Sequence, residues 1–496
     1  MTSPSLIIGS AQGALIHQLG RMSNRHGLVA GATGTGKTVT LQVLAEGFSR
    51  LGVPVFAADI KGDLSGLAAP GTTNSKIDER LGVMNLSSHR FQPCPAVFWD
   101  LYGENGHPVR TTISEMGPLL LAHLLELNET QTGVIYAGFD IADDQGLLLL
   151  DLKDFRSLLA WMGENAGTLT NTYGNITSAS VGAIQRRLLV LEEQGAEMFF
   201  GEPGLKLEDI MHTDFSGRGV VSVFDASRLV HQAPRVYAAF LLWLLSELFE
   251  NLPEVGDKDL PKLVLFFDEA HLLFDGAPKP LKDKIEQVVR LIRSKGVGIY
   301  FITQNPLDIP DDVLGQLGMK IQHALRAFTP NDQKTIKAVS QSFMANSSFD
   351  TADVLTAMGI GEALVSVLDE EGRPQPVQRT LIAPPEGKIG PLSPDERASV
   401  VGRSPLKGRY EQAVDRESAY ELLKRRADEV QADVSRQKEA TNRDSEWGRF
   451  EEPVRQGRQR QSVGETMLKS AARSIGSQLG RQIIRGVLGS IFGGRR

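Results

Sequence analysis

The sequence predicts an α/β protein: a parallel sheet flanked by helices, with a largely helical insertion and a C-terminal helical tail. Short apolar runs typical of buried strands alternate with stretches of helical periodicity, which is the pattern of a sheet covered on both faces. A glycine-rich phosphate-binding motif follows one of the first apolar runs, where such motifs occur in α/β proteins. The 496 residues, 41% of them apolar, are enough for one large core with additions or for two domains.

The first element that points to chemistry is the stretch GATGTGKT, which fits G-x-x-x-x-G-K-[ST] at every fixed position and follows the apolar run 28–30. It comprises Gly31, Ala32, Thr33, Gly34, Thr35, Gly36, Lys37 and Thr38. Its glycines let backbone N–H groups converge on phosphates, while Lys37 adds a positive charge and Thr38 a hydroxyl for Mg²⁺. A dinucleotide-binding turn is excluded, because Val39 stands where G-x-G-x-x-G needs its third glycine.

Two later strand-like runs end in acidic residues. Asp59 ends the run 53–59, and Asp268 and Glu269 directly follow the five apolar residues 263–267. Ligands of α/β sheets bind at the carboxyl ends of the strands, where an aspartate can hold the water shell of Mg²⁺ and a glutamate can take a proton from water. Paired acids after a strand are a weak signal alone, but together with the upstream loop they predict a hydrolytic nucleotide site.

A further strand, expected over 298–303, delivers Gln304 to the same edge of the sheet. Its neutral amide suits a group that senses the terminal phosphate or orients the attacking water. The alternative is a strand-end amide that caps a turn. We favour the functional interpretation.

The chain divides by pattern into five segments. The core that carries the phosphate loop is expected in two parts, residues 1–66 and 216–385. A mostly helical insertion over 67–215 separates them, with helices near 112–128, 150–163 and 178–194. A proline- and glycine-rich linker and a charged helical region are expected over 386–464. Residues 465–496 form the tail.

The tail has its own composition, basic and striped with apolar residues. It carries Lys469, Arg473, Arg481, Arg485, Arg495 and Arg496 and no acidic residue after Glu465. A basic amphipathic helix fits an oligomerisation or protein-docking surface, an anionic membrane surface or nucleic acid. The first of these interpretations is favoured, with peripheral membrane contact second.

Composition limits the partners and the compartment. The net charge of −7 gives no global field that would attract nucleic acid, so any contact with DNA must be local. The single cysteine, Cys94, excludes an intrachain disulfide and every C-x-x-C motif, which suits a reducing compartment. Because the sequence also shows neither a signal peptide nor a membrane-length apolar run, it predicts a cytoplasmic protein.

In order along the chain, the phosphate loop, Asp59, FFDEAH and a strand ending in ITQNP resemble the HerA/FtsK superfamily of P-loop ATPases. RHGLVAGATGTGKT, FAADIKGDLSGL, FWDLYGENGHPVRTTISEMGPLL and LIRSKGVGIYFITQNP are similar, in more detail, to its bacterial YjgR-like, HerA-like branch over residues 1–385. The resemblance implies a RecA/ASCE-like P-loop NTPase core and a homo-oligomer, expected to be a hexamer. It also implies Mg-ATP hydrolysis between subunits and movement of DNA.

The resemblance also implies a role for each matching residue. Lys37 and Thr38 would bind phosphate and Mg²⁺, Asp268 would be the second metal-shell acid, and Glu269 the catalytic base. Gln304 would be the sensor. Arg293 falls where the family has an arginine that reaches into a neighbour's site, and Arg326 is a second candidate for that role.

The sequence departs from the superfamily in one respect. HerA motors carry a β-barrel before the ATPase core, whereas here the phosphate loop begins at residue 31. We therefore expect a helicase-like DNA translocase but keep open an ATPase that remodels or assembles proteins. The third class, a nucleotide-regulated scaffold without turnover, is disfavoured because Lys37, Asp268 and Glu269 are all present and a pure switch needs no positioned base.

Overall fold

The computed structural model describes residues 3–256, 258–275, 279–326 and 329–447. The chain divides into two compact units, residues 1–426 and 427–496. The described part of the second unit is the end of helix α15 (Ala419–Trp447). The tail predicted over 465–496 lies outside the described residues.

The described residues of the first unit form a twelve-stranded mixed sheet, ordered β2-β1-β12-β11-β10-β3-β9-β8-β4-β7-β5-β6. Neighbouring strands from β10 to β6 run parallel, and the four at the other end pair antiparallel. The predicted α/β class with a parallel sheet is therefore confirmed. The strands are β1 (Ser5–Ala11), β2 (Ala14–Leu19), β3 (Gly27–Ala30), β4 (Val55–Asp59), β5 (Ala96–Asp100), β6 (His107–Pro108), β7 (Val221–Asp225), β8 (Leu263–Phe267), β9 (Val297–Thr303), β10 (Met319–His323), β11 (Glu362–Ser366) and β12 (Gln378–Ile382).

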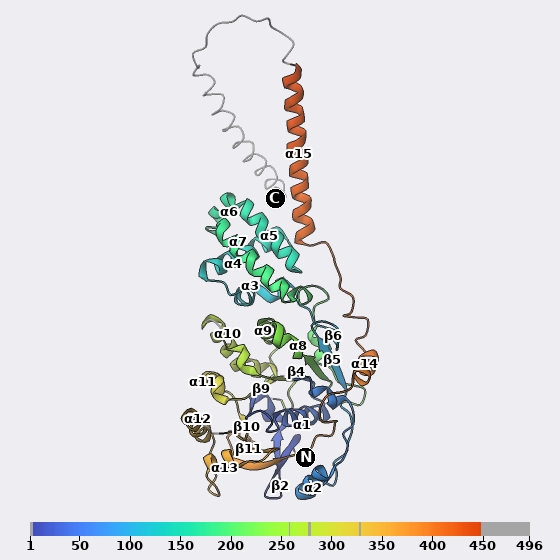
Figure 1. The fold of residues 1–496 in the computed structure, drawn as a ribbon, viewed down its shortest axis with the longest axis vertical. Helices are drawn as coiled ribbons and strands as arrows, with labels where there is room; N and C mark the ends of the chain where they lie inside the picture. Colours follow the sequence, from blue (N-terminus) through green and yellow to red (C-terminus); the bar gives the residue numbers. More distant parts are fainter. Residues whose placement is uncertain (1–2, 257, 276–278, 327–328, 448–496) are drawn as a thin grey trace, which may run out of the picture. The chain divides into compact units, whose positions relative to one another are not determined.

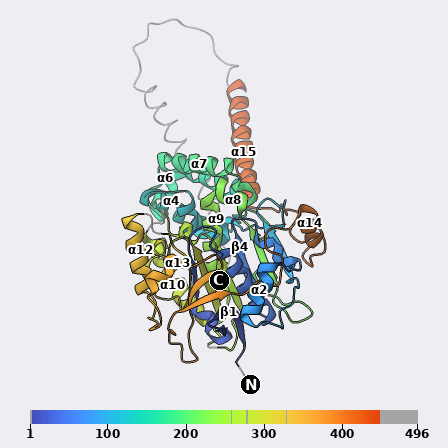
Figure 2. The same ribbon diagram turned by 60° about the horizontal axis from the view of Figure 1, so that its bottom comes forward.

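Helices cover both faces of the parallel strands because successive strand residues point to opposite faces (Figure 2). In β4, Val55 and Ala57 join the apolar cluster of helix α1 (Lys37–Arg50). Phe56 lies in a second cluster, where its ring centroid is 6.1 Å from that of Phe240 on α9 (Pro234–Asn251). Burial on both faces explains why these strands are continuous apolar runs in the sequence.

Helices α3 to α7 gather together within the range predicted as the insertion (Figure 1). They are α3 (Ile113–Leu124), α4 (Glu129–Gln145), α5 (Leu152–Glu164), α6 (Ala166–Tyr173) and α7 (Ser178–Glu193). The predicted range 67–215 also contains α2 (Ser75–Met84) and the strands β5 and β6, which complete the core sheet. The helical part is therefore narrower than the prediction.

The structure also differs from the predicted linker that begins at residue 386. The buried carboxylate of Glu46 on α1 accepts hydrogen bonds from the backbone N–H groups of Glu386 and Gly387, at 2.6 and 2.9 Å. Farther along, the buried Tyr410 packs edge to face on Trp99. This stretch is thus part of the core surface. The other helices are α8 (Ser227–Gln232), α10 (Lys279–Leu291), α11 (Asp311–Leu314), α12 (Pro330–Gln341), α13 (Thr351–Ala357) and α14 (Pro394–Gly402).

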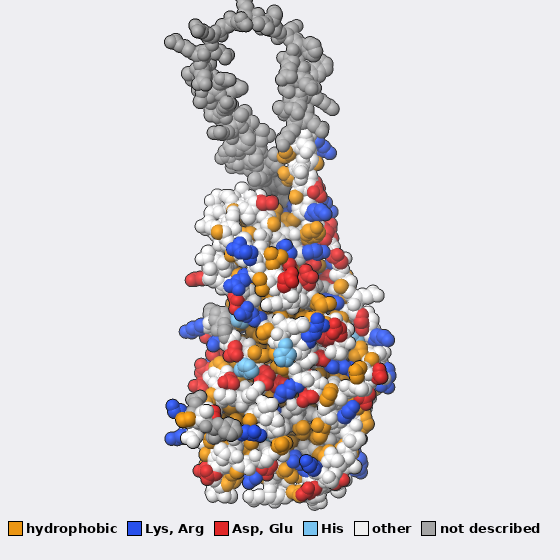
Figure 3. Space-filling model, viewed as in Figure 1, with side chains coloured by type: hydrophobic (Ala, Val, Ile, Leu, Met, Phe, Trp, Pro, Cys, Tyr) orange, Lys and Arg blue, Asp and Glu red, His pale blue; other side chains and the backbone are white. Residues whose placement is uncertain are grey.

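The surface carries charges of both signs. On the face drawn in Figure 3, lysine and arginine side chains are interspersed with acidic ones rather than gathered into one field. Within the described residues, no helix has the length and apolar character needed to cross a membrane.

Candidate active site

The candidate site lies at the carboxyl edge of the parallel strands. The phosphate loop connects β3 to α1, with β9 and then β8 on one side of β3. Glu269 follows the end of β8 and Gln304 the end of β9, so the strand order brings both residues to the loop. Three segments far apart in the sequence therefore meet at this edge.

Lys37, the first residue of α1, is held across the phosphate loop. Its Nζ atom donates hydrogen bonds to the carbonyl oxygens of Gly31 and Ala32, at 2.6 and 3.2 Å. Burial and the neighbouring Lys61 lower the pKa of the ammonium group, while Glu269 and Asp268 oppose that shift. A cation in this position lies where the motif places phosphate oxygens.

The loop is braced by β10 and by the turn before β11. The N–H group of Ala32 donates to the carbonyl of Ala324, and that of Gly361 donates to the carbonyl of Thr35, both at 3.0 Å. Gly36 has φ +115°, a conformation that disfavours any side chain, at the start of α1. The loop's shape is therefore set before any ligand arrives.

The end of β8 is fixed in an unusual backbone conformation. The hydroxyl of Tyr237, a buried residue of α9, donates to the carbonyl of Asp268 at 2.8 Å. Glu269 then adopts a left-handed conformation with φ +46°, which is uncommon for a non-glycine residue and recurs at functional sites. Burial and the adjacent Glu269 raise the pKa of Asp268 to about 6.

A chain of side-chain hydrogen bonds connects the acid to the loop. The amide nitrogen of Gln304 donates to Oε1 of Glu269 at 3.0 Å, and the hydroxyl of Thr33 donates to the amide oxygen of Gln304 at 3.3 Å. Within the described part of the chain, the buried Oε2 atom of Glu269 accepts no hydrogen bond; Nδ1 of His271 lies 3.4 Å away. One carboxylate oxygen is thus held by Gln304, and the other, which makes no hydrogen bond in the described structure, is the candidate proton acceptor.

Asp59 ends β4, as the sequence predicts, but its carboxylate is directed to its own loop. Its carboxylate accepts the N–H groups of Lys61, Gly62 and Leu64, at 2.8–3.2 Å, so it shapes the loop that follows β4. That loop carries Asp63. Burial raises the pKa of Asp63 above its usual value, and Lys61 and a hydrogen bond with Thr38 oppose this shift. Asp63 is therefore the carboxylate beside the loop hydroxyl.

The oxygen groups of Thr38, Asp63 and Asp268 fit a hard cation such as Mg²⁺. Among the described residues, no group of three or more His, Cys, Asp or Glu side chains is arranged to hold a metal. Proteins usually bind Mg²⁺ through one or two carboxylates together with the substrate's phosphates. Such a cation would depend on the bound nucleotide.

The two candidate arginines lie at different edges of the sheet. Arg293 precedes β9, whose seven residues span about 20 Å, so it lies near the edge opposite to Gln304 and the loop. Arg326 follows β10 and lines, with Ala32 and Thr33, a hollow of about 430 Å³ beside the phosphate loop. The structure therefore brings Arg326 to the site of its own chain and leaves Arg293 away from it.

Sequence reasoning missed three supporting groups: Tyr237, Asp63 and the turn that contains Gly361. Asp63 could have been found, because it follows Asp59 in the quoted stretch DIKGD. Tyr237 carried only a weak signal, a polar aromatic residue in an otherwise apolar helix. The turn carried none, since its contact with Thr35 depends on the pairing of β10 with β11.

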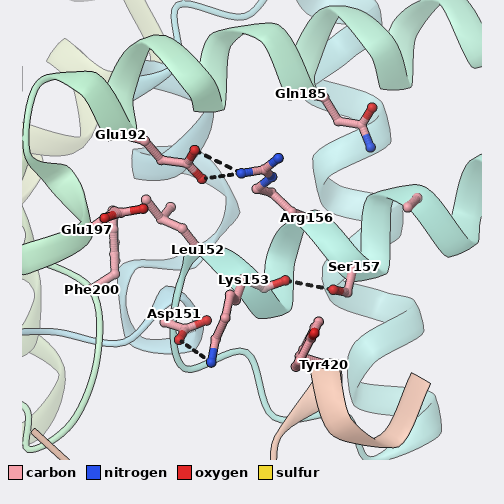
Figure 4. Close-up of a pocket in the computed structure, with 11 residues that line it drawn as sticks. Asp151, Leu152, Lys153, Arg156, Ser157, Gln185, Glu192, Glu197, Phe200 and Tyr420 are labelled. Atoms are coloured by element: carbon pink, nitrogen blue, oxygen red, sulfur yellow. Dashed lines mark hydrogen bonds and ion pairs between the residues drawn. The ribbon is translucent and has the colours of Figure 1, made fainter. Parts of the chain in front are cut away.

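A second cavity, of about 590 Å³, lies among α5, α7 and the start of α15 (Figure 4). Its charged side chains pair with one another. Arg156 donates to both carboxylate oxygens of Glu192, at 2.9 and 3.0 Å, and Nζ of Lys153 lies 3.9 Å from Asp151. Because these cations are already neutralised, the cavity lacks the character of a phosphate site, which the loop edge has.

Comparison with known proteins agrees with this geometry. The family described as Helicase HerA-like C-terminal matches residues 5–496. The DNA double-strand break repair helicase HerA of Sulfolobus acidocaldarius is 22% identical over 364 residues, 69% of this chain and 62% of that protein. Its namesake from Sulfurisphaera tokodaii is 30% identical over 151 residues, 30% of this chain and 29% of that protein. Each match spans less than two thirds of the relative's length.

A solved structure shares the fold. The plasmid coupling protein TrwB, in complex with the non-hydrolysable GTP analogue GDPNP, superposes with a TM-score of 0.51 at 14% identity. The superposition covers 79% of this chain and 91% of that one. At this identity the likeness concerns the fold alone.

Proposed function

The chain belongs to the Helicase HerA-like C-terminal family of HerA/FtsK-like ATPases, and from this premise we propose that it is a Mg-ATP-hydrolysing motor that acts as an oligomer to translocate DNA. The observation that carries the proposal is the hydrogen-bonded chain from Thr33 through Gln304 to Glu269. It holds a carboxylate with one unoccupied oxygen at a fixed place beside the phosphate loop. A nucleotide-regulated scaffold would have no use for that arrangement.

The residues divide the reaction between them. Lys37 exchanges its loop carbonyls for phosphate oxygens, and Gln304 orients the attacking water. Oε2 of Glu269 takes the proton of that water as the new bond to the terminal phosphorus forms and the bond to the ADP oxygen breaks. Thr38, Asp63 and Asp268 would hold Mg²⁺, which would neutralise phosphate charge in the bound nucleotide.

Oligomerisation is proposed because of where Arg293 lies. It is about one strand length from its own phosphate loop, so within one chain it is too far to touch the terminal phosphate. In a ring, the opposite edges of neighbouring sheets can face each other, and Arg293 would then complete the next subunit's site. A hexamer is the assembly we propose.

The DNA substrate rests on family membership and on relatives named as DNA repair helicases. The net charge of −7 and the interspersed charges in Figure 3 favour the second candidate, an ATPase that remodels or assembles proteins. DNA contact in this protein would be local, as in the pore of a ring.

Steady-state ATPase of the full-length protein, with and without single- and double-stranded DNA, tests the proposal. We expect hydrolysis that DNA stimulates and that Lys37→Ala abolishes together with nucleotide binding. Hydrolysis that is Lys37-dependent but indifferent to both DNA forms would favour the second candidate. No Lys37-dependent hydrolysis would refute both.

A further inference from the structure

One side of the phosphate loop is occupied by a feature that the hydrolytic chemistry does not use. The acids and Gln304 approach β3 from the side of β9 and β8. On the other side lie β10 and β11, paired antiparallel, with the turn Met358–Glu362 at the carboxyl edge of β10. The turn touches the loop, since the N–H group of Gly361 donates to the carbonyl of Thr35.

The turn is held rigidly from several directions. The N–H of Gly359 donates to the carboxylate of Glu362 at 2.8 Å, and the N–H of Glu362 donates to the carbonyl of Gly359 at 3.2 Å. Arg80 of α2 donates to the carbonyls of Gly361 and Ile360, at 3.2 and 3.5 Å. The conformation at the tip therefore does not depend on a ligand.

At the tip of this rigid turn, the side chain of Ile360 is 75% exposed, whereas Met358, two residues earlier, is 7% exposed. A single exposed apolar residue is ordinary on a protein surface. Ile360 differs from an ordinary exposed residue because its turn contacts the phosphate loop. Under the proposed function the terminal phosphate lies near Glu269, so an extended nucleotide would place its base on the other side of the loop, where β10 and β11 lie.

We infer that Ile360 is the contact for the nucleotide's base and that the turn Met358–Glu362 forms the base side of the site. This inference rests on the proposed function. Covering Ile360 with the flat face of a base would bury apolar surface on both partners. The turn has already been ordered by its own hydrogen bonds, so little conformational entropy is lost on binding.

The same turn predicts how the base is recognised. The carbonyls of Ile360 and Gly361 already accept donors from Arg80, and the N–H of Gly361 is committed to Thr35. Contact with the ring face therefore decides affinity, rather than hydrogen bonds to the edge of the base. Adenine and guanine nucleotides should bind alike, and the smaller pyrimidine rings more weakly.

The test is calorimetric binding to the full-length Glu269→Gln protein, in which nucleotide is not consumed. Ile360→Ser is titrated with MgATP, MgGTP and inorganic tripolyphosphate, which has phosphates but no base. The matched control is Val190→Ser on α7, which removes an apolar side chain that is 56% exposed far along the chain from the loop. We expect Ile360→Ser to weaken ATP and GTP by about tenfold, leaving tripolyphosphate and the melting temperature unchanged.

Two results would overturn the assignment. Equal weakening of tripolyphosphate would mean that Ile360 supports the loop rather than the base. Unchanged ATP binding would place the base elsewhere. Failure of the underlying function has a different signature, because Lys37→Ala in the same background would then leave both ATP and tripolyphosphate binding intact.

Discussion

Four neighbouring parallel strands, β8, β4, β7 and β5, bring an aspartate to the same edge of the sheet, yet these carboxylates are used in two ways. Asp59, Asp225 and Asp100 lie in register at the ends of β4, β7 and β5, and each is buried. Asp268 follows β8 and is paired in sequence with Glu269. An identical position in the fold therefore does not define a role.

The difference lies in what each carboxylate accepts. Asp59 and Asp100 each receive three backbone N–H groups of their own following loops. Asp225 receives the amide and hydroxyl of Ser227 and a 2.8 Å ion pair from Arg397. Glu269 keeps one oxygen without a hydrogen bond in the described structure. The carboxylates of Asp59 and Asp100 shape the loops that follow them, whereas Glu269, next to Asp268, keeps the oxygen that we propose as the proton acceptor.

The largest effect is expected from Glu269→Gln, which tests whether Glu269 is the proton acceptor. The amide keeps the shape of the side chain but has no lone pair on the atom that replaces Oε2, so it is unable to accept the proton of water. We expect turnover to fall by about 10²–10⁴-fold with ATP binding retained, measured by steady-state hydrolysis and calorimetry. Wild-type turnover would assign the base elsewhere.

The second test extends the comparison to the neighbouring subunit. Arg293→Ala and Glu269→Gln should each be inactive, but a mixed oligomer contains interfaces with an intact arginine beside an intact base. At equal mixing these are about a quarter of the interfaces, so about a quarter of wild-type activity should return.

The control for this mixture is Lys37→Ala with Glu269→Gln. Both residues belong to one site, so no subunit in that mixture has a complete site and no activity should return. Activity absent from the Arg293 mixture as well, with mixed oligomers demonstrated by mass, would rule out a role in trans for Arg293.

Much of the fold was predictable because the central parallel strands are buried on both faces and therefore read as apolar runs. The run 263–267 and the strand 298–303 are examples, and both are strands in the structure. β5 was missed because it follows a proline-rich stretch. The region after residue 386 was predicted as a linker because it is rich in proline and glycine. Its start is nevertheless fixed to the core, since the N–H groups of Glu386 and Gly387 donate to the carboxylate of Glu46 on α1.

At the site, the sequence placed the phosphate loop, Glu269 and Gln304 at strand ends, and the structure brings them together. Their chemical roles remain predictions. The sequence does not show which hydrogen bonds each carboxylate accepts. Asp59 accepts three N–H groups of its own loop because the backbone after β4 turns them toward it. The distance of Arg293 from the loop, in contrast, was available from the sequence, because Arg293 precedes the strand expected over 298–303 and Gln304 follows it.

The third prediction concerns Asp225, at the end of β7. Asp225→Ala leaves Arg397, whose side chain is 13% exposed, without its partner, and its guanidinium also packs over the ring of Phe98. We expect unfolding free energy to fall by about 3 kcal/mol in urea titrations, with turnover per folded molecule unchanged. Arg397→Met added to Asp225→Ala should restore part of the loss. Lost turnover at unchanged stability would put Asp225 with the catalytic group.

The effect expected from Asp59→Asn depends on pH. Burial, with the charge of Asp63, raises the pKa of Asp59 from 3.8 to about 7. Between those values the unfolded carboxyl is ionised and the folded one protonated, so the stabilisation is complete at low pH and is lost as pH rises through about 7. The unfolding free energy of the wild type, relative to Asp59→Asn, should therefore fall by about 1.4 kcal/mol per pH unit between about pH 5 and pH 7 and level off above. Turnover should follow the folded fraction alone.

A difference in unfolding free energy that does not change with pH would contradict this prediction. It would show that the three N–H groups of the loop keep Asp59 charged, and the contrast with Glu269 would then depend on hydrogen bonding alone.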